Sequence, residues 1–174
     1  MRIAIISDIH DNFHNLSLAI KIIKNNSAEL IICLGDLTSN GVARELSSCG
    51  ILVKCIWGNN DGEKFAITKT SLSEGSKLIM SRTTYDFLKI DDRDIFITHF
   101  PYLVKHMAKS GDFDAIFFGH THIKSEDNIN NCLIVNPGEI AAYRDRVASF
   151  ALYDTKNNNV EFIEIPNSIS TKAI

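Results

Sequence analysis

Short apolar runs alternate with helix-like segments in the first half of the chain, and this alternation limits the folds open to it. Residues 2–7, 29–34 and 51–57 are apolar runs of strand length, suited to strands that are covered on both faces. The segments between them, 11–26 and 40–49, repeat apolar residues at helical intervals of three and four. This strand–helix–strand–helix–strand order favours a parallel sheet with right-handed crossovers.

The second half of the chain mixes helices with hairpins. We predict helices over residues 62–72 and 101–110. The predicted strands cover residues 83–90, 93–98, 114–118, 123–129, 132–135, 148–154 and 159–164. Asn-rich turns between these strands are typical of hairpins. Crossover units and hairpins both fit an α/β fold in which two sheets face one another with helices outside. Because no repeat or linker interrupts the pattern, we predict one domain over residues 1–174.

The composition is that of a soluble globular protein, with 45% hydrophobic and 22% charged residues. A net charge of −3 gives no electrostatic footprint for duplex nucleic acid or an anionic membrane, so we expect neither as a partner. The apolar runs are too short to span a bilayer. The first ten residues are typical of a strand and not of a signal peptide, which favours a cytoplasmic location.

The four cysteines are Cys33, Cys49, Cys55 and Cys132. None forms a C-x-x-C pair, and three of them lie in apolar, strand-like runs. We therefore expect small core residues in a reducing compartment and not a thiolate metal site.

Acids, imidazoles and an amide directly follow five of the predicted strands. In chain order they are Asp8 and His10, Asp36, Asn59, His99, and the pair His120 and His122. Each of these patterns alone is weak, because an Asp after a strand is usually a turn residue and a lone His is usually structural. In open α/β sheets, however, ligands bind outside the carboxyl ends of the strands. We therefore expect all seven side chains to gather at one edge.

The chemistry of these seven side chains points to metal. They offer oxygen and nitrogen donors without a thiolate, which suits Mn, Fe, Co, Ni or Zn more than Ca or Mg. One ion would rarely need seven ligands, whereas two ions that share a bridging carboxylate would use them well. Two ions about 3.5–4 Å apart are suited to the hydrolysis of phosphate esters.

The motifs Asp8-x-His10, Gly35-Asp36, Gly58-Asn59-x-Asp61, His99 and Gly119-His120-Thr121-His122 resemble, in order, those of the calcineurin-like metallophosphoesterases. The chain is most similar to their small bacterial and archaeal phosphodiesterases, whose Asn-Pro-Gly motif it shares at residues 136–138. The resemblance implies a four-layer α-β-β-α sandwich of two mixed β-sheets flanked by helices. It also implies two divalent ions per chain. Mn²⁺ is the preferred candidate, and Ni²⁺, Zn²⁺, Fe²⁺ or Mg²⁺ are alternatives.

The same resemblance implies how the ligands divide and what they do. Asp8, His10 and His122 would hold the first ion, Asn59, His99 and His120 the second, and Asp36 would bridge them. A hydroxide between the ions would attack a small phosphodiester, and a homodimer is a further expectation. Two other functions stay open: a non-catalytic interaction scaffold, like the small subunit of retromer, and a phosphomonoesterase.

Some positions depart from the family pattern. Asn60 stands where many members carry a His that protonates the leaving group, and an amide cannot supply that proton. We assign Asn60 to the substrate, together with Asn12, which is also the expected N-cap of the first helix. No side chain is assigned a catalytic proton transfer. Asp11 replaces a usual Gly, and Glu139 stands where Ser is frequent and receives no role.

Further residues near these motifs allow two interpretations each. Asp11 is a helix N-terminal charge or an acid at the mouth of the site. His14 is a proton donor or an exposed helical residue. Arg144 and Arg146 clamp a substrate phosphate or belong to a solvated loop. Residues 62–80 could partly cover the site.

Overall fold

The computed structural model describes residues 1–144 and 146–170. One sheet has the strand order β11-β10-β1-β2-β3-β4 and the other the order β5-β6-β7-β9-β8. The strands of the first sheet are β1 (Arg2–Ile6), β2 (Leu30–Cys33), β3 (Leu52–Cys55), β4 (Leu78–Met80), β10 (Ser149–Asp154) and β11 (Asn159–Glu164). The strands of the second sheet are β5 (Tyr85–Ile90), β6 (Arg93–Thr98), β7 (Ala115–Phe118), β8 (Ser125–Ile129) and β9 (Cys132–Asn136). Both sheets are mixed, since β1 to β4 and the β6, β7 and β9 strands run parallel and the remaining pairings are antiparallel.

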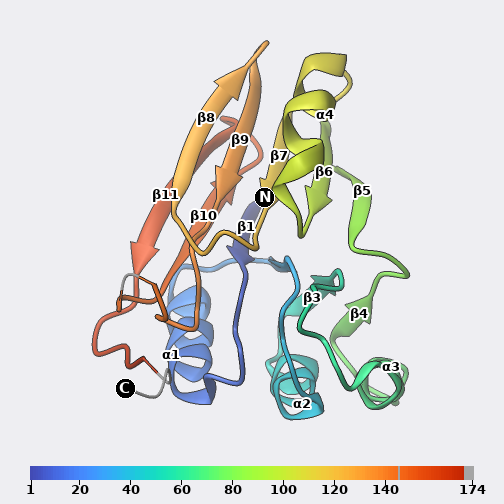
Figure 1. Ribbon diagram of the computed structural model, residues 1–174, viewed down its shortest axis with the longest axis vertical. Coiled ribbons are helices and arrows are strands. Elements are labelled where there is room, and N and C mark those ends of the chain that lie inside the picture. Colours follow the sequence, from blue (N-terminus) through green and yellow to red (C-terminus); the bar gives the residue numbers. More distant parts are fainter. Residues whose placement is uncertain (145, 171–174) are drawn as a thin grey trace.

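The helices cover the outer faces of the two sheets. They are α1 (Phe13–Asn25), α2 (Asn40–Ser48), α3 (Lys64–Ser71) and α4 (Val104–Ser110), the last preceded by a 3-10 turn at Pro101–Leu103. Figure 1 shows α1, α2 and α3 together at the lower end of the view and α4 at the upper end. The predicted N-cap of α1 is confirmed, because the Asn12 Oδ1 accepts a hydrogen bond from the Asn15 backbone N–H at 3.1 Å.

Alternation along the buried strands divides the core into layers. In β1, Ile3 and Ile5 pack between the two sheets, while Ala4 and Ile6 face α1 and α2. The strand is thus buried on both faces, which is why its sequence is apolar without a break. A third cluster joins α4 to the outer face of the second sheet through residues such as Ile116. This arrangement confirms the predicted four-layer α-β-β-α sandwich.

The structure contains one strand that the sequence did not predict. Strand β4 was not predicted, because three residues at a sheet edge, one of them the half-exposed Ile79, carry too short a pattern. The segment 62–80 belongs to the scaffold, since α3 packs against α2 and β4 pairs with β3. Trp57 is buried, with the Lys64 ammonium 5.5 Å from its ring centroid.

All four cysteines are buried and free, which agrees with their predicted place in the core. Among the described residues, no helix combines the length and the apolar character needed to cross a membrane.

Candidate metal centre

The loops after β1, β2, β3, β6 and β7 bring all seven predicted ligands to one end of the two sheets. Several of these residues adopt the left-handed backbone conformation, which is uncommon outside glycine. Their φ angles are +53° at Asp8, +46° at His10, +55° at Asp36, +68° at His120 and +63° at His122. Such conformations cost free energy and cluster at functional sites, where the surrounding structure imposes them.

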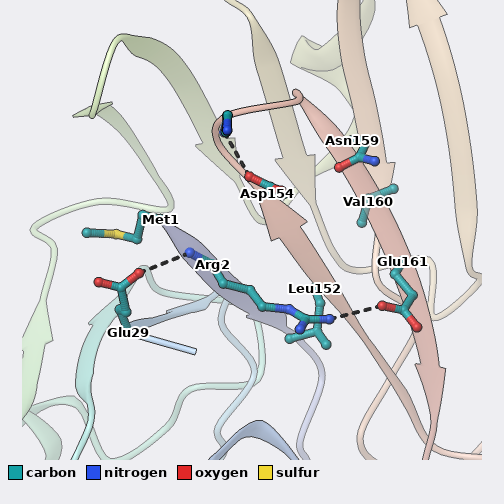
Figure 2. A pocket seen from close by; sticks show the side chains of 9 residues that line it. Met1, Arg2, Glu29, Leu152, Asp154, Asn159, Val160 and Glu161 are labelled. Carbon is teal, nitrogen blue, oxygen red and sulfur yellow. Dashed lines mark hydrogen bonds and ion pairs between the residues drawn. The ribbon is translucent and has the colours of Figure 1, made fainter. Parts of the chain in front are cut away.

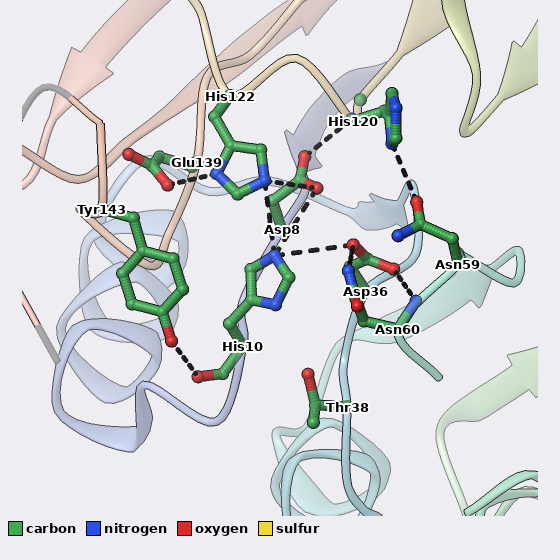
Figure 3. A network of polar contacts seen from close by, with 12 residues as sticks. Asp8, His10, Asp36, Thr38, Asn59, Asn60, His120, His122, Glu139 and Tyr143 are labelled. Atoms are coloured by element: carbon green, nitrogen blue, oxygen red, sulfur yellow. Dashed lines mark hydrogen bonds and ion pairs between the residues drawn. The ribbon is translucent and has the colours of Figure 1, made fainter. Parts of the chain in front are cut away.

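Asp8, His10 and His122 form a first group of donors (Figure 3). The Nε2 atoms of His10 and His122 lie 3.4 Å apart. The Asp8 Oδ1 lies 3.4 Å from the His122 Nε2 and 3.9 Å from the His10 Nε2. Three potential ligand atoms therefore point at one small volume.

Asn59, His99 and His120 form a second group. The Asn59 Oδ1 lies 2.8 Å from the His99 Nε2 and 2.8 Å from the His120 Nδ1. On its other side, the His99 Nδ1 donates a hydrogen bond to the Leu34 carbonyl at 2.8 Å. Because a carbonyl only accepts, a neutral His99 directs the lone pair of Nε2 into the site.

Asp36 lies between the two groups. Its Oδ2 is 3.5 Å from the His10 Nε2 and 3.7 Å from the His99 Nε2. Asn60 donates to both oxygens, through its backbone N–H to Oδ1 and through its side-chain amide to Oδ2, each at 2.7 Å. Asp36 also forms a compact donor set with Asp8 and His99, so either carboxylate is placed to serve both groups.

The electrostatics of Asp8 fit a cation at this place. Its side chain is fully buried, and its Oδ1 accepts no hydrogen bond from the described residues. Burial raises the pKa of Asp8 against the opposing influence of His122, and burial lowers the pKa of His10. Buried carboxylates are normally paired or bind metal. Together with the oxygen and nitrogen donors around it, this unpartnered oxygen fits a divalent transition metal ion.

Glu139, which received no role from the sequence, contacts a predicted ligand. It is 1% exposed, and its Oε2 accepts a hydrogen bond from the His122 Nδ1 at 2.5 Å. Its Oε1 accepts the Arg144 backbone N–H at 2.5 Å. A carboxylate behind a ligand imidazole selects the tautomer and aims the other nitrogen at the metal. The only signal in the sequence was an acid directly after the Asn136–Gly138 turn.

The Glu139 contact also shifts both pKa values. Burial alone would lower the pKa of His122, but its hydrogen bond to Glu139 and the nearby carboxylate of Asp8 outweigh that effect and raise it. Burial alone would raise the pKa of Glu139, yet hydrogen bonds from His122 and from the backbone of Arg144 lower it. Both shifts favour an imidazolium–carboxylate pair in the metal-free protein.

Asp61 ties together the loops after β2 and β3. Its Oδ2 accepts the backbone N–H groups of Gly58 at 2.6 Å and Asp36 at 3.2 Å. Its Oδ1 accepts the backbone N–H of Thr38 at 3.0 Å. Asp61 is buried, so the motif Gly58-Asn59-x-Asp61 combines one predicted ligand with the residue that holds its loop in place.

Two motif glycines are required by close packing of these loops. A Cβ at Gly58 would lie 2.1 Å from the Asp36 Oδ1, and one at Gly119 would lie 2.1 Å from the Ser7 Oγ. Only glycine lets the backbone pass this close to the carboxylates.

The two predicted substrate contacts, Asn60 and Asn12, lie in different environments. Asn60 is exposed at the centre, beside Asp36, where a substrate can reach it. Asn12 is not accessible to a substrate, because it is fully buried and its amide donates to the carbonyls of Ala141 and Ile169. The substrate assignment of Asn12 is therefore wrong, because capping α1 and anchoring the chain near Ile169 occupy its side chain.

Asp11, His14 and Arg144 also have defined neighbours. Asp11 accepts a hydrogen bond from the Ser39 hydroxyl at 2.5 Å, which links it to the N-cap of α2. His14 is exposed and contacts the Asn167 carbonyl at 3.1 Å. Arg144 lines a cavity with His120 and His122, whereas Arg146 is exposed with no role assigned by the structure.

A separate cavity of about 520 Å³ lies at the opposite, amino end of β1 (Figure 2). Arg2 pairs there with Glu161 at 3.1 Å and donates a backbone hydrogen bond to Glu29 at 3.3 Å. Arg2 thus has a carboxylate partner in this cavity, whereas the Asp8 Oδ1, at the carboxyl end of the strand, has no hydrogen-bond partner among the described residues.

Comparison with known proteins agrees with this geometry. Residues 1–158 match the family model of the calcineurin-like phosphoesterase superfamily domain. The chain belongs to this superfamily. The curated phosphodiesterase MJ0936 of Methanocaldococcus jannaschii is 32% identical over 170 residues, which cover 95% of this chain and 98% of that protein. The prediction of a metal-dependent phosphoesterase is thereby confirmed.

Solved structures lead to the same assignment of fold. An archaeal phosphodiesterase superposes with a TM-score of 0.86 at 30% identity, covering 94% of this chain and 99% of that one. The phosphoesterase YfcE of E. coli has a TM-score of 0.68 at 16% identity, covers 95% and 100%, and shows likeness of fold alone.

Proposed function

We propose that this member of the superfamily is a dinuclear metal-dependent phosphodiesterase that hydrolyses a small phosphodiester. The observation that carries the proposal is the position of Asp36, whose Oδ2 lies 3.5 Å from the His10 Nε2 and 3.7 Å from the His99 Nε2. A carboxylate between two donor groups suits two ions and not one. Both the curated relative and the structural neighbour near 30% identity are phosphodiesterases.

We assign the ligands as the resemblance to the family implies. Asp8, His10 and His122 would hold the first ion, Asn59, His99 and His120 the second, and Asp36 would contact both. Such ions, when bound, polarise phosphoryl oxygens and activate water for attack on phosphorus. Mn²⁺ is our first choice of ion, and the cytoplasm our choice of location.

Asn60 determines which leaving groups we expect the protein to release. Its side-chain amide donates to Asp36 at 2.7 Å and is exposed, so it can donate to a phosphoryl oxygen. It cannot protonate a leaving alkoxide. Esters with good leaving groups should therefore react fastest, since they need no proton from the protein.

The test begins with protein stripped by a chelator. Mn²⁺, Ni²⁺, Zn²⁺ or Mg²⁺ is added back singly, and hydrolysis of bis-p-nitrophenyl phosphate is followed beside that of p-nitrophenyl phosphate. We expect turnover that needs metal and favours the diester. Preference for the monoester would instead make the protein a phosphomonoesterase.

The variant Asp36→Asn examines the dinuclear arrangement, with Asp127→Asn, an exposed acid on β8, as its matched control. We expect Asp36→Asn to lose at least about 100-fold in kcat and to bind fewer ions by calorimetry. Full activity with one bound ion would contradict the dinuclear proposal.

A further inference from the structure

Aromatic rings adjoin both donor groups of the candidate metal centre. Beside the first group, the ring of Tyr143 stacks on His10 with centroids 5.2 Å apart and an interplanar angle of 28°. Beside the second group, the ring of Phe100 lies 5.0 Å from His99 and 5.1 Å from His120. Figure 3 shows Tyr143 and His120 at opposite ends of the cluster. A phosphate at the centre would thus have an aromatic neighbour on each side.

A cavity extends from Tyr143 across the cluster to His120. This cavity of about 490 Å³ is lined by Tyr143, Arg144, His120 and His122, a volume in the range of small-ligand pockets. The Tyr143 hydroxyl donates a hydrogen bond to the His10 carbonyl at 3.3 Å, which fixes the orientation of the ring beside the cavity. Arg144 is exposed and brings a positive charge to the wall.

The Phe100 side is an open shelf. Tyr102 stacks on Phe100 with centroids 5.2 Å apart and an interplanar angle of 21°, and 64% of Tyr102 is exposed. Pro101 between them fixes one backbone torsion in the 3-10 turn. The shelf is therefore a pair of stacked rings on a stiff segment, with the outer ring open to solvent.

We propose that the substrate carries a planar aromatic group on each side of its phosphate, as in a diester that links two nucleosides. One base would enter the cavity beside Tyr143 and Arg144, and the other would stack on the shelf of Phe100 and Tyr102. Stacking on aromatic side chains accepts any base, so the recognition would be of nucleosides as a class and not of one sequence. This inference rests on the proposed phosphodiesterase function.

Three diesters with the same leaving group test the inference on the Mn²⁺-loaded protein. They are bis-p-nitrophenyl phosphate, the p-nitrophenyl ester of thymidine 5′-phosphate and ethyl p-nitrophenyl phosphate. In each, water adds to phosphorus, the bond to p-nitrophenolate breaks, and the other ester group stays on the phosphate. We expect the ethyl ester to have a KM about 10-fold or more above the other two, with similar kcat, because its ethyl group cannot stack and only one of its two ester groups is aromatic. Equal KM values would overturn the inference.

Two variants locate the effect. Tyr143→Leu and Tyr102→Leu should each raise the KM of the thymidine ester about fivefold or more. The ethyl ester has a single ring, which can occupy only one of the two sites, so at most one of the variants should raise its KM, and neither should change the number of bound Mn²⁺ ions. The control is Tyr85→Leu, since Tyr85 is a 40% exposed tyrosine on β5 that contacts Phe87, and it should change neither KM.

Equal losses for both esters in both variants, or a parallel loss of bound Mn²⁺, would mean that the tyrosines merely support the histidines and would overturn the inference. Absence of metal-dependent turnover with all three diesters is a distinct result, because it would overturn the proposed function itself.

Discussion

Removing the Asp61 carboxylate should destabilise the protein in proportion to the hydrogen bonds lost. Its two oxygens accept three backbone N–H groups, from Gly58, Asp36 and Thr38. An unsatisfied buried donor costs about 1–3 kcal/mol. Asp61→Ala leaves all three unpaired, so we expect a loss of at least about 3 kcal/mol from a total of about 5–15 kcal/mol.

Asp61→Asn gives a graded test of the same reasoning. One side-chain oxygen can still accept from Gly58 and Asp36, which share the Oδ2 of Asp61. The amide nitrogen would then face the Thr38 N–H, donor against donor, where Oδ1 now accepts. We expect this variant to lose about 1–3 kcal/mol, which places it between the wild type and Asp61→Ala.

The measurement is urea unfolding in the presence of a chelator, so that bound metal does not contribute to the free energy of unfolding. Asp127→Ala, on the exposed face of β8, serves as the control and should change it by less than about 0.5 kcal/mol. If Asp61→Ala cost less than about 1 kcal/mol, or if Asp61→Asn were as destabilising as Asp61→Ala, the hydrogen-bond explanation would be refuted.

Three other expectations concern Glu139, metal removal and the thiols. Glu139→Gln should weaken Mn²⁺ binding about 10-fold or more by calorimetry, with exposed Glu126→Gln as the unaffected control; equal affinities would show that His122 needs no carboxylate behind it. Removal of metal by a chelator should lower Tm. Mn²⁺ at about 100 times its Kd should raise the free energy of unfolding by about 2.7 kcal/mol, because the ion gives the Asp8 Oδ1 a partner. A Tm that is the same with and without metal would contradict the proposed site. Burial raises the pKa of Cys132 to about 11 and the pKa values of Cys49 and Cys55 above their usual range, so these three thiols stay protonated at pH 8. They should react with a disulfide reagent only as fast as the protein unfolds, and rapid labelling of the folded state would refute this.

Much of the scaffold could be predicted from the sequence because its signals are local. The apolar run of β1 and the helical spacing in α1 each lie within one element, and the structure places these elements within a residue or two of the predicted ranges. The convergence of Asp8, Asp36 and Asn59 was also predictable. They follow β1, β2 and β3, which are parallel neighbours in one sheet and therefore bring their carboxyl ends to one edge.

The tertiary structure alone decided which polar groups are partners and which are free. Asn12 was predicted to contact substrate, yet its side-chain amide donates a hydrogen bond to the backbone carbonyl of Ile169, 157 residues away. Glu139 looked like a loop acid, yet the turn before it aims the carboxylate at His122. No pattern marked β4, because an edge strand of three residues is stabilised by its neighbour β3 and not by its own sequence. Periodicity specifies elements and the order of strands specifies where their ends meet, whereas the pairing of side chains depends on loop conformations that form only once the two sheets have packed.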